Sequence, residues 1–274
     1  MSSPKSQMPS SAQPGRAIST ASLFTHGRPE RIGDAAERVA ALASRLGVEL
    51  VDADRAEMIV VLGGDGTMLR ALQAALPFRA VCLGVNFGRV GFLTSIDADH
   101  LEQGLERAFA GDFEELRLPT IIGDAGQGTV TGINDIVLTS GLLGRMALVE
   151  WCVDGQSLGE LGCDGVIVAT STGSTAYNLS AGGPVLAWGL DGFVVSFVSP
   201  HSLHARSMVL GRPHRVELHN RSVDVPVQVI VDGHIAGEVA PGGRFAVTMG
   251  DAFARLGRLS DTSFFSRYRQ TFSG

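Results

Sequence analysis

The chain has 274 residues, of which 45% are hydrophobic and 18% charged, with a formal net charge of -6. This length allows one large domain or two, and the acidic balance argues against nucleic acid as a general partner. No apolar run approaches the roughly 18 residues that a membrane-spanning helix needs, so no membrane partner is expected. The first residues are rich in Ser, Pro and Gln and lack the apolar core of a secretion signal, which predicts a disordered tail over 1–18.

Three cysteines, Cys82, Cys152 and Cys163, are scattered along the chain, and no two of them form a C-x-x-C pair. An odd number of scattered cysteines is typical of proteins from a reducing compartment. We therefore expect free thiols in a cytoplasmic protein.

Predicted strands and helices alternate from residue 19 to residue 118. Short β-branched and aliphatic runs predict buried strands, and apolar residues spaced three and four apart predict helices. The strands are expected at 18–24, 58–62 and 80–85, and the helices at 32–47, 67–76 and 97–111, the last with Asp97 as its cap. This alternation indicates an α/β domain with a Rossmann-like parallel sheet, whose ligands bind beyond the carboxyl ends of the strands.

After Pro119 the pattern changes. Strand-like segments such as GTVTGINDIVLTS and VPVQVIVDGHIAGEVA follow one another, with Asp-Gly and Gly-Gly turns between strands. We expect a mostly antiparallel β domain over 119–245. The end of the remaining segment 246–274, SDTSFFSRYRQTF, reads as a capped helix or an extended tail.

The first loop with chemical character is GGDGT, at residues 63–67, directly behind the strand-like run MIVVL. It has neither the G-K-[ST] ending of a P-loop nor the G-x-G-x-x-G spacing of a dinucleotide-binding turn. The backbone amides of Gly66 and Thr67 are suited to cradle a phosphate at a helix N-terminus. Asp65 would then take a proton from a hydroxyl or bind magnesium, or else it only caps the following helix. The loop by itself leaves these alternatives open.

A second loop, CDGVIVATSTGSTAYNLSAGGP at 163–184, gathers hydroxyl side chains and glycines behind a strand and surrounds Tyr177. Amides and hydroxyls in such a loop bind phosphate or ribose, and a tyrosine ring can stack on a base. A flexible linker is the alternative. Asn134 and Asp135, in TGINDIVLTS, open a predicted strand and by themselves indicate a turn more than a site.

Taken in order, GGDGT, LGVNFGRVGFLT, the Asn-Asp pair, TGSTAYNLSAGGP and SPHSLHARSMVL resemble the NAD kinase family, from about residue 55 to the C-terminus. The resemblance implies that 246–274 returns to the α/β domain. It implies transfer of the terminal phosphate of ATP, or of polyphosphate, to the 2′-hydroxyl of the adenosine ribose of NAD, with a divalent ion such as Mg²⁺. It also implies a homodimer or homotetramer, in which a neighbour's β domain completes part of the site.

Carried over position by position, the resemblance makes Asp65 the base for the ribose hydroxyl and names no residue as a dedicated metal ligand. The residues that would contact the nucleotides and their phosphates are Gly66, Arg70, Asn134, Asp135, Arg145, Asp164, Thr175, Ala176, Tyr177, Asn178, Leu179, Ser180 and His234. The family often has Gln or Asn in place of His234, and a proline in place of Ser171.

Two rival functions are open. A dinucleotide-binding regulatory protein would have no need of a carboxylate at Asp65. A lipid or sphingoid-base kinase of the same superfamily would need an apolar acceptor cleft, whereas the second loop is rich in hydroxyls. Several histidines share no metal-ligand spacing, so surface or hydrogen-bonded roles are expected for His201, His204, His214 and His219.

Overall fold

The computed structural model describes residues 13–27, 30, 32–78, 80–88, 91–126 and 128–272. The chain divides into two compact units, an α/β unit that comprises 13–117 and 254–272 of these residues and a β unit that comprises 118–253. The two changes of unit fall within the long strands β7 (Glu114–Asp124) and β18 (Arg244–Arg258). The sequence places these changes at 118/119 and 245/246.

The α/β unit is built on a parallel sheet, and the predicted alternation of strands and helices is confirmed. Its strands follow the order β18-β5-β4-β2-β3, with β6 beside β5. The strands are β2 (Thr20–Thr25), β3 (Glu49–Leu50), β4 (Met58–Gly63), β5 (Val81–Asn86) and β6 (Ile96–Asp97). The helices are α1 (Ala35–Leu46), α2 (Asp65–Ala75), the 3₁₀ turn Ala98–His100, α3 (Leu101–Phe109) and α5 (Phe264–Phe272).

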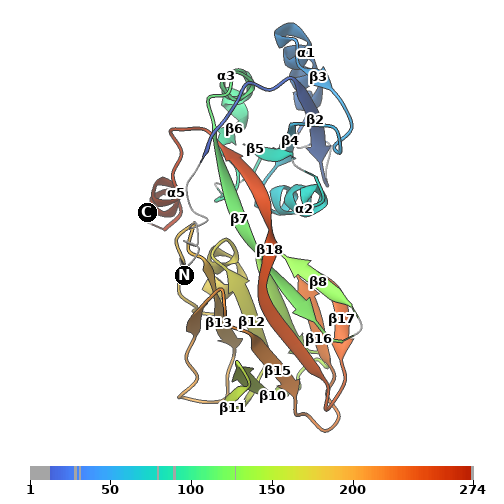
Figure 1. The fold of residues 1–274 in the computed structure, drawn as a ribbon, viewed down its shortest axis with the longest axis vertical. Coiled ribbons are helices and arrows are strands. Elements are labelled where there is room, and N and C mark those ends of the chain that lie inside the picture. The colour runs from blue at the N-terminus through green and yellow to red at the C-terminus, as the bar shows by residue number, and fades with distance from the viewer. Residues whose placement is uncertain are drawn as a thin grey trace, which may run out of the picture. The chain divides into compact units, whose positions relative to one another are not determined.

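The order of the strands creates a point where the chain reverses its direction across the sheet. From β2 the chain moves outward to β3, and it then returns to β4 and β5 on the other side of β2. Because βαβ crossovers are right-handed, α1 and α2 cover opposite faces, and α3 packs beside α1 (Figure 1). The carboxyl ends of β2 and β4 therefore flank a switch point, which is where open α/β sheets bind ligands.

The tail prediction is wrong for residues 13–18. Strand β1 (Gln13–Pro14) pairs antiparallel with the start of β7, and the Gly15 amide donates to the carbonyl of Phe113. Ile18 is buried in the core of this unit. Composition did not show that the edge of β7 offers partners for this backbone. Residues 1–12 lie outside the described residues.

The helix ends differ in detail from the expectation. Asp97 precedes the 3₁₀ turn but makes no capping hydrogen bond with its side chain.

Near the C-terminus of the chain, the prediction of a capped helix is confirmed. Ser263 and Ser266 exchange side-chain hydrogen bonds with each other's amides at the start of α5.

The β unit is mostly antiparallel, as predicted, and its core lies between two sheets. One sheet has the order β14-β13-β12-β9-β16-β17, and the other contains β11, β10, β15 and β18. The strands are β8 (Thr129–Gly132), β9 (Asp135–Ser140), β10 (Ala147–Val153), β11 (Gln156–Cys163), β12 (Gly165–Thr170), β13 (Gly192–Val198), β14 (Met208–Gly211), β15 (Val216–Asn220), β16 (Val227–Val231) and β17 (His234–Val239). After β12 come the 3₁₀ turn Gly173–Thr175 and α4 (Tyr177–Ser180).

Side chains of both sheets fill this core, where Trp151 meets Phe197 edge to face with ring centroids 5.4 Å apart. The other face of the six-stranded sheet carries a smaller cluster that includes Val137, Ile167 and Leu186. The loop that follows β12 contributes Leu186, so apolar contacts hold this loop against the sheet. Within the described part of the chain, no helix combines the length and apolarity needed to cross a bilayer.

Candidate functional site

A cavity of about 340 Å³ lies at the switch point of the α/β unit. His26 and Gly27 follow β2, and Gly63 and Gly64 lie at the end of β4. Further lining comes from Ile32, Leu62, Thr67, Phe87 and Gly88. Helix α2 begins beside this cavity, so its first amides, which have no acceptor within the helix, are available to an anion.

Asp65 is the first residue of α2, and its side chain does not cap that helix. The N-cap position belongs to Gly64, and no side-chain cap hydrogen bond is made there. The carboxylate instead accepts one hydrogen bond from the Phe92 amide (2.7 Å, at Oδ2) and one from the Leu93 amide (3.0 Å, at Oδ1). The capping alternative is therefore wrong. The side chain joins the GGDGT turn to the loop after β5.

Two glycines permit this close packing. A Cβ on Gly91 would fall 2.2 Å from Asp65 Oδ1, and one on Gly63 would fall 2.4 Å from Thr67 Oγ1. Any larger residue at either position would displace the carboxylate or the threonine. Gly66 and Arg70 are exposed on α2, and neither is among the residues that line the cavity.

In the β unit, strand register brings three segments together. Asp135 opens β9 opposite Ala169 near the end of β12, and Ile136 lies opposite Val231 at the end of β16. The start of β9, the loop after β12 and the turn between β16 and β17 therefore share one end of the six-stranded sheet. His234, the first residue of β17, is exposed at the same turn.

Asp232 organises this end of the sheet, although only an Asp-Gly turn marks its position in the sequence. Its carboxylate accepts hydrogen bonds from the amides of Ile133, Asn134 and Asp135, at 2.8–3.1 Å. Its backbone is left-handed, with φ of 48°. This conformation, together with Gly233 at positive φ, turns the chain so that the carboxylate reaches back to the start of β9.

The hydrogen bonds to Asp232 hold the backbone of Asn134 and Asp135 in place. The buried Oδ1 atom of Asn134 has no hydrogen-bond partner, while its backbone carbonyl accepts the amide of Thr170 at 2.9 Å. Asp135 is 5% exposed, and desolvation, together with the charge of Asp232, raises its pKa to about 7. A buried acceptor without a partner is costly, so this end of the sheet suits a ligand that donates a hydrogen bond.

The hydroxyl-rich loop is an ordered structure and not a flexible linker. Thr170 Oγ1 donates to the Ile133 carbonyl and accepts from two amides of the loop. Asn178 is fully buried, donates to the carbonyls of Ser174 and Pro184, and accepts from Ser196 Oγ. The side chain of Asn178 therefore holds the loop together, and its contact with a nucleotide stays a prediction.

The remaining predicted residues of the loop have accessible surface. Tyr177 and Ser180 are exposed, whereas Thr175, Ala176 and Leu179 are half-buried. Thr175 Oγ1 donates to a carbonyl within the loop, that of Thr172. The Tyr177 ring is thus available to stack on a base.

Asp164 and Arg145 are not part of this cluster. Asp164 precedes β12, and its carbonyl accepts the amide of Ser140 at the far end of β9. Arg145 lies in the loop after β9 and forms a two-pronged ion pair with Asp224. A strand of the length of β9 is about 17 Å long, so within one chain these residues are separated from Asp135. Within one chain Asp164 and Arg145 therefore lie apart from Asn134 and Asp135, and their contact with the nucleotides stays a prediction.

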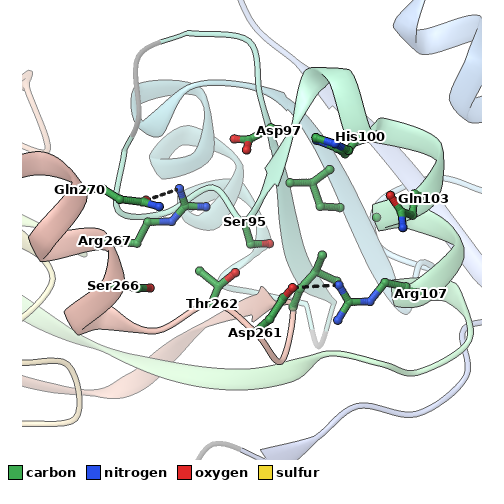
Figure 2. Close-up of a pocket in the computed structure, with 13 residues that line it drawn as sticks. Ser95, Asp97, His100, Gln103, Arg107, Asp261, Thr262, Ser266, Arg267 and Gln270 are labelled. Carbon is green, nitrogen blue, oxygen red and sulfur yellow. Dashed lines mark hydrogen bonds and ion pairs between the residues drawn. The ribbon is translucent and has the colours of Figure 1, made fainter.

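A second cavity, of about 380 Å³, lies in the α/β unit between α3 and the segment before and within α5 (Figure 2). Arg107 bonds to Asp112, Ser260 and Asp261, and the buried Arg267 donates to the Thr94 carbonyl. These charges join the C-terminal segment to the rest of the unit. None of the predicted site residues lines this cavity.

The chain matches two family models that together cover most of its length. The ATP-NAD kinase N-terminal domain matches residues 17–113, and the ATP-NAD kinase C-terminal domain matches residues 133–259. The chain belongs to the NAD kinase family. It is an NAD kinase by function, a phosphotransferase that converts NAD to NADP, in line with the interpretation of its motifs.

Individual NAD kinases are similar over nearly the whole chain. That of Gemmatimonas aurantiaca is 35% identical over 254 residues, which cover 90% of this chain and 84% of that protein. That of Heliobacterium modesticaldum is 38% identical over 239 residues, with coverage of 85% and 84%.

Two solved structures share the fold. An NAD kinase from Archaeoglobus fulgidus in complex with ATP superposes with a TM-score of 0.76 at 28% identity, covering 93% of this chain and 97% of that one. Yeast NADH kinase complexed with NADH superposes with a TM-score of 0.80 at 18% identity, covering 95% and 88%, and shows likeness of fold alone.

Proposed function

We propose that this NAD kinase uses ATP as its phosphoryl donor and Asp65 as the base that activates the 2′-hydroxyl of the adenosine ribose of NAD. The observation that carries the proposal is the fixed carboxylate of Asp65 beside the glycine-lined cavity at the switch point. The solved relative in complex with ATP supports ATP as the donor.

Asp65 is suited to proton transfer because its orientation is held by backbone and not by mobile side chains. Each carboxylate oxygen accepts one amide and retains a further lone pair for a substrate hydroxyl. As the ribose oxygen forms its bond to the terminal phosphorus, its proton passes to Asp65 and the bond from that phosphorus to the bridging oxygen breaks, which releases ADP. The amides at the start of α2 offset the charge conflict between carboxylate and phosphate.

The residues present also fit a divalent ion such as Mg²⁺. This ion takes oxygen ligands and is usually held by one or two carboxylates together with substrate phosphates. One spare lone pair of Asp65 would supply such a ligand beside phosphate oxygens of ATP, while the other remains for the ribose hydroxyl. When bound, the ion neutralises charge on the phosphates.

We assign the β unit to NAD. Asn134 and Asp135 are placed to bind the adenine and ribose, because the Asn134 Oδ1 acceptor is buried and lacks a hydrogen bond. Tyr177 is exposed on the neighbouring loop and offers its ring to the base. Asp232 and Thr170 are positioning residues, since they act through the backbone of residues 133–135 and through the loop.

Asp164 and Arg145 would contact NAD that is bound by a second copy of the chain. These residues lie at the opposite end of β9 from Asn134, and so lie apart from the cluster that we assign to the adenine and ribose within the same copy. In a homodimer or homotetramer, this end of one β unit supplies contacts to NAD bound by its neighbour.

The three buried free cysteines support a reducing compartment, and we assign the protein to the cytoplasm. Cell fractionation would test this assignment.

The test is a product assay with NAD and NADH as acceptors and ATP and polyphosphate as donors, in all four pairings. NADP from NAD and ATP is the expected product, and the other pairings define the substrate range. If NAD binds but none of the four pairings gives a product, the result would point to a regulatory protein. Phosphorylation of a sphingoid base in place of NAD would point to a lipid kinase.

A further inference from the structure

Four polar side chains form a patch on the outer face of the β unit. Strands β10 and β15 pair so that Glu150 lies opposite His219 and Cys152 lies opposite Glu217. Side chains alternate between the two faces of a strand, and the intervening Trp151 points into the core. The patch residues therefore share the opposite face, although the two strands that carry them are far apart in the chain.

His219 is buried in this patch without a hydrogen bond to either ring nitrogen. It is 8% exposed, with Nδ1 3.4 Å from Glu150 Oε2 and Nε2 3.8 Å from Glu217 Oε2. His219 is therefore not a surface residue, and its ring lies between two carboxylates. By contrast, the exposed His214 bonds to Asp154 at 2.7 Å, as expected for a surface or hydrogen-bonded histidine.

The ligand atoms of Glu150, Cys152 and His219 all lie within 4.8 Å of one another. Ligands of a tetrahedral Zn²⁺ ion lie about 3.4 Å apart, so small side-chain rotations bring these three into range. The other ring nitrogen faces the Glu217 carboxylate, and metal-bound histidines commonly donate their second N–H to such a group. One thiol, one imidazole and one carboxylate form a donor set that suits a borderline ion.

The neighbouring cations compete with a metal for this patch. Arg221 donates to Glu150 Oε2 through Nε at 2.9 Å and Nη2 at 2.5 Å, and Ser157 donates to Oε1. Arg215 pairs with Glu217. Arg221 is half-exposed, so its guanidinium can turn toward water and leave the Glu150 carboxylate free to bind a metal.

We propose that Glu150, Cys152 and His219 form a Zn²⁺ site, with water as the fourth ligand and Glu217 orienting the histidine. Binding forms a bond between the metal and the Cys152 sulfur, and the thiol proton passes to solvent. The site is independent of the kinase residues, because it draws on no side chain assigned to NAD or ATP.

The test begins with the unaltered, tag-free, reduced protein. Titration with Co²⁺ should give one equivalent of binding and a thiolate-to-cobalt charge-transfer band, and excess Zn²⁺ should abolish that band. X-ray absorption of the Zn²⁺ form should show one sulfur at about 2.3 Å and N or O neighbours at about 2.0–2.1 Å. These measurements need no variant that might unfold.

Variants then identify the ligands. Cys152→Ser should remove the charge-transfer band, and His219→Gln should greatly weaken binding. Glu217→Gln should weaken binding about 10–100-fold, as expected for a group that orients a ligand. His214→Gln is the matched control and should bind Co²⁺ like the parent, whereas Arg221→Gln should bind more tightly because a competing cation is removed.

Absence of a sulfur ligand in the X-ray absorption spectrum would overturn the proposal. So would an unchanged band in a folded Cys152→Ser variant, or equal loss of binding in the His214→Gln control. The patch would then be an ion-pair network in which His219 bridges two carboxylates.

Discussion

Replacing Asp65 by Asn separates a proton-accepting role from a purely structural one. The side chain keeps its shape, and its carbonyl oxygen can still accept one of the two amides that Asp65 now binds, at Phe92 and Leu93. Its NH₂ group faces the other amide, however, and two donors cannot bond to each other. The variant therefore loses one hydrogen bond as well as its capacity to take a proton.

The two losses differ in size. A hydrogen bond to a charged group contributes about 1.5–3 kcal/mol, and partial exposure of Asp65 places the stability cost at the lower end of that range. Removal of a general base costs about 10²–10⁴-fold in turnover, which corresponds to about 3–5 kcal/mol in the barrier. We expect a modest fall in Tm and a collapse of kcat, with NAD binding retained.

The assay measures kcat at saturating NAD and ATP, well below the Tm of the variant, together with calorimetric binding of NAD. Asp99→Asn is the control, since it removes an exposed acid from the start of another helical turn and should leave turnover unchanged. Gly91→Ala keeps the acid but places a Cβ 2.2 Å from Oδ1, so it should lower kcat by displacing the carboxylate. A folded Asp65→Asn variant that retains more than about a tenth of the parental kcat would refute the base assignment and leave Asp65 as a tether.

Three further outcomes are expected. Asn134→Ala should weaken NAD binding by about 1–3 kcal/mol with the fold intact, and an unchanged KM for NAD would contradict the assignment. Asp135 has a folded-state pKa raised to about 7, so its contribution to stability is complete below about pH 4 and is lost as the pH rises through 7. Asp135→Asn should therefore gain stability relative to the parent between pH 5 and 8, by up to about 4 kcal/mol, and parallel curves of Tm against pH would exclude this. Deletion of 1–12 should leave activity and Tm nearly unchanged, whereas deletion of 1–18 should lower Tm because it strips the edge of β7 and removes Ile18 from the core.

Much of the secondary structure and the family of this protein could be predicted from the sequence, because these features depend on residues that are close together in the chain. The strand–helix alternation before residue 118 and the antiparallel segments after it follow from side-chain periodicity, which a short window of residues contains. The glycines of GGDGT likewise indicate a turn after a buried strand, because the strand and the glycines lie within one short window of residues. The order of these motifs along the chain was enough to indicate the NAD kinase family.

The tertiary structure decided which residues act together. The amides that hold Asp65 come from the loop after a different strand, and Asp232 reaches Asn134 only because β16 pairs with β9. The pairing of β12 with β9 separates Asp164 from Asn134 by the length of a strand, and the pairing of β10 with β15 brings His219 against Glu150. Pairing between distant strands depends on the packing of the whole sheet, so no local window of sequence contains it.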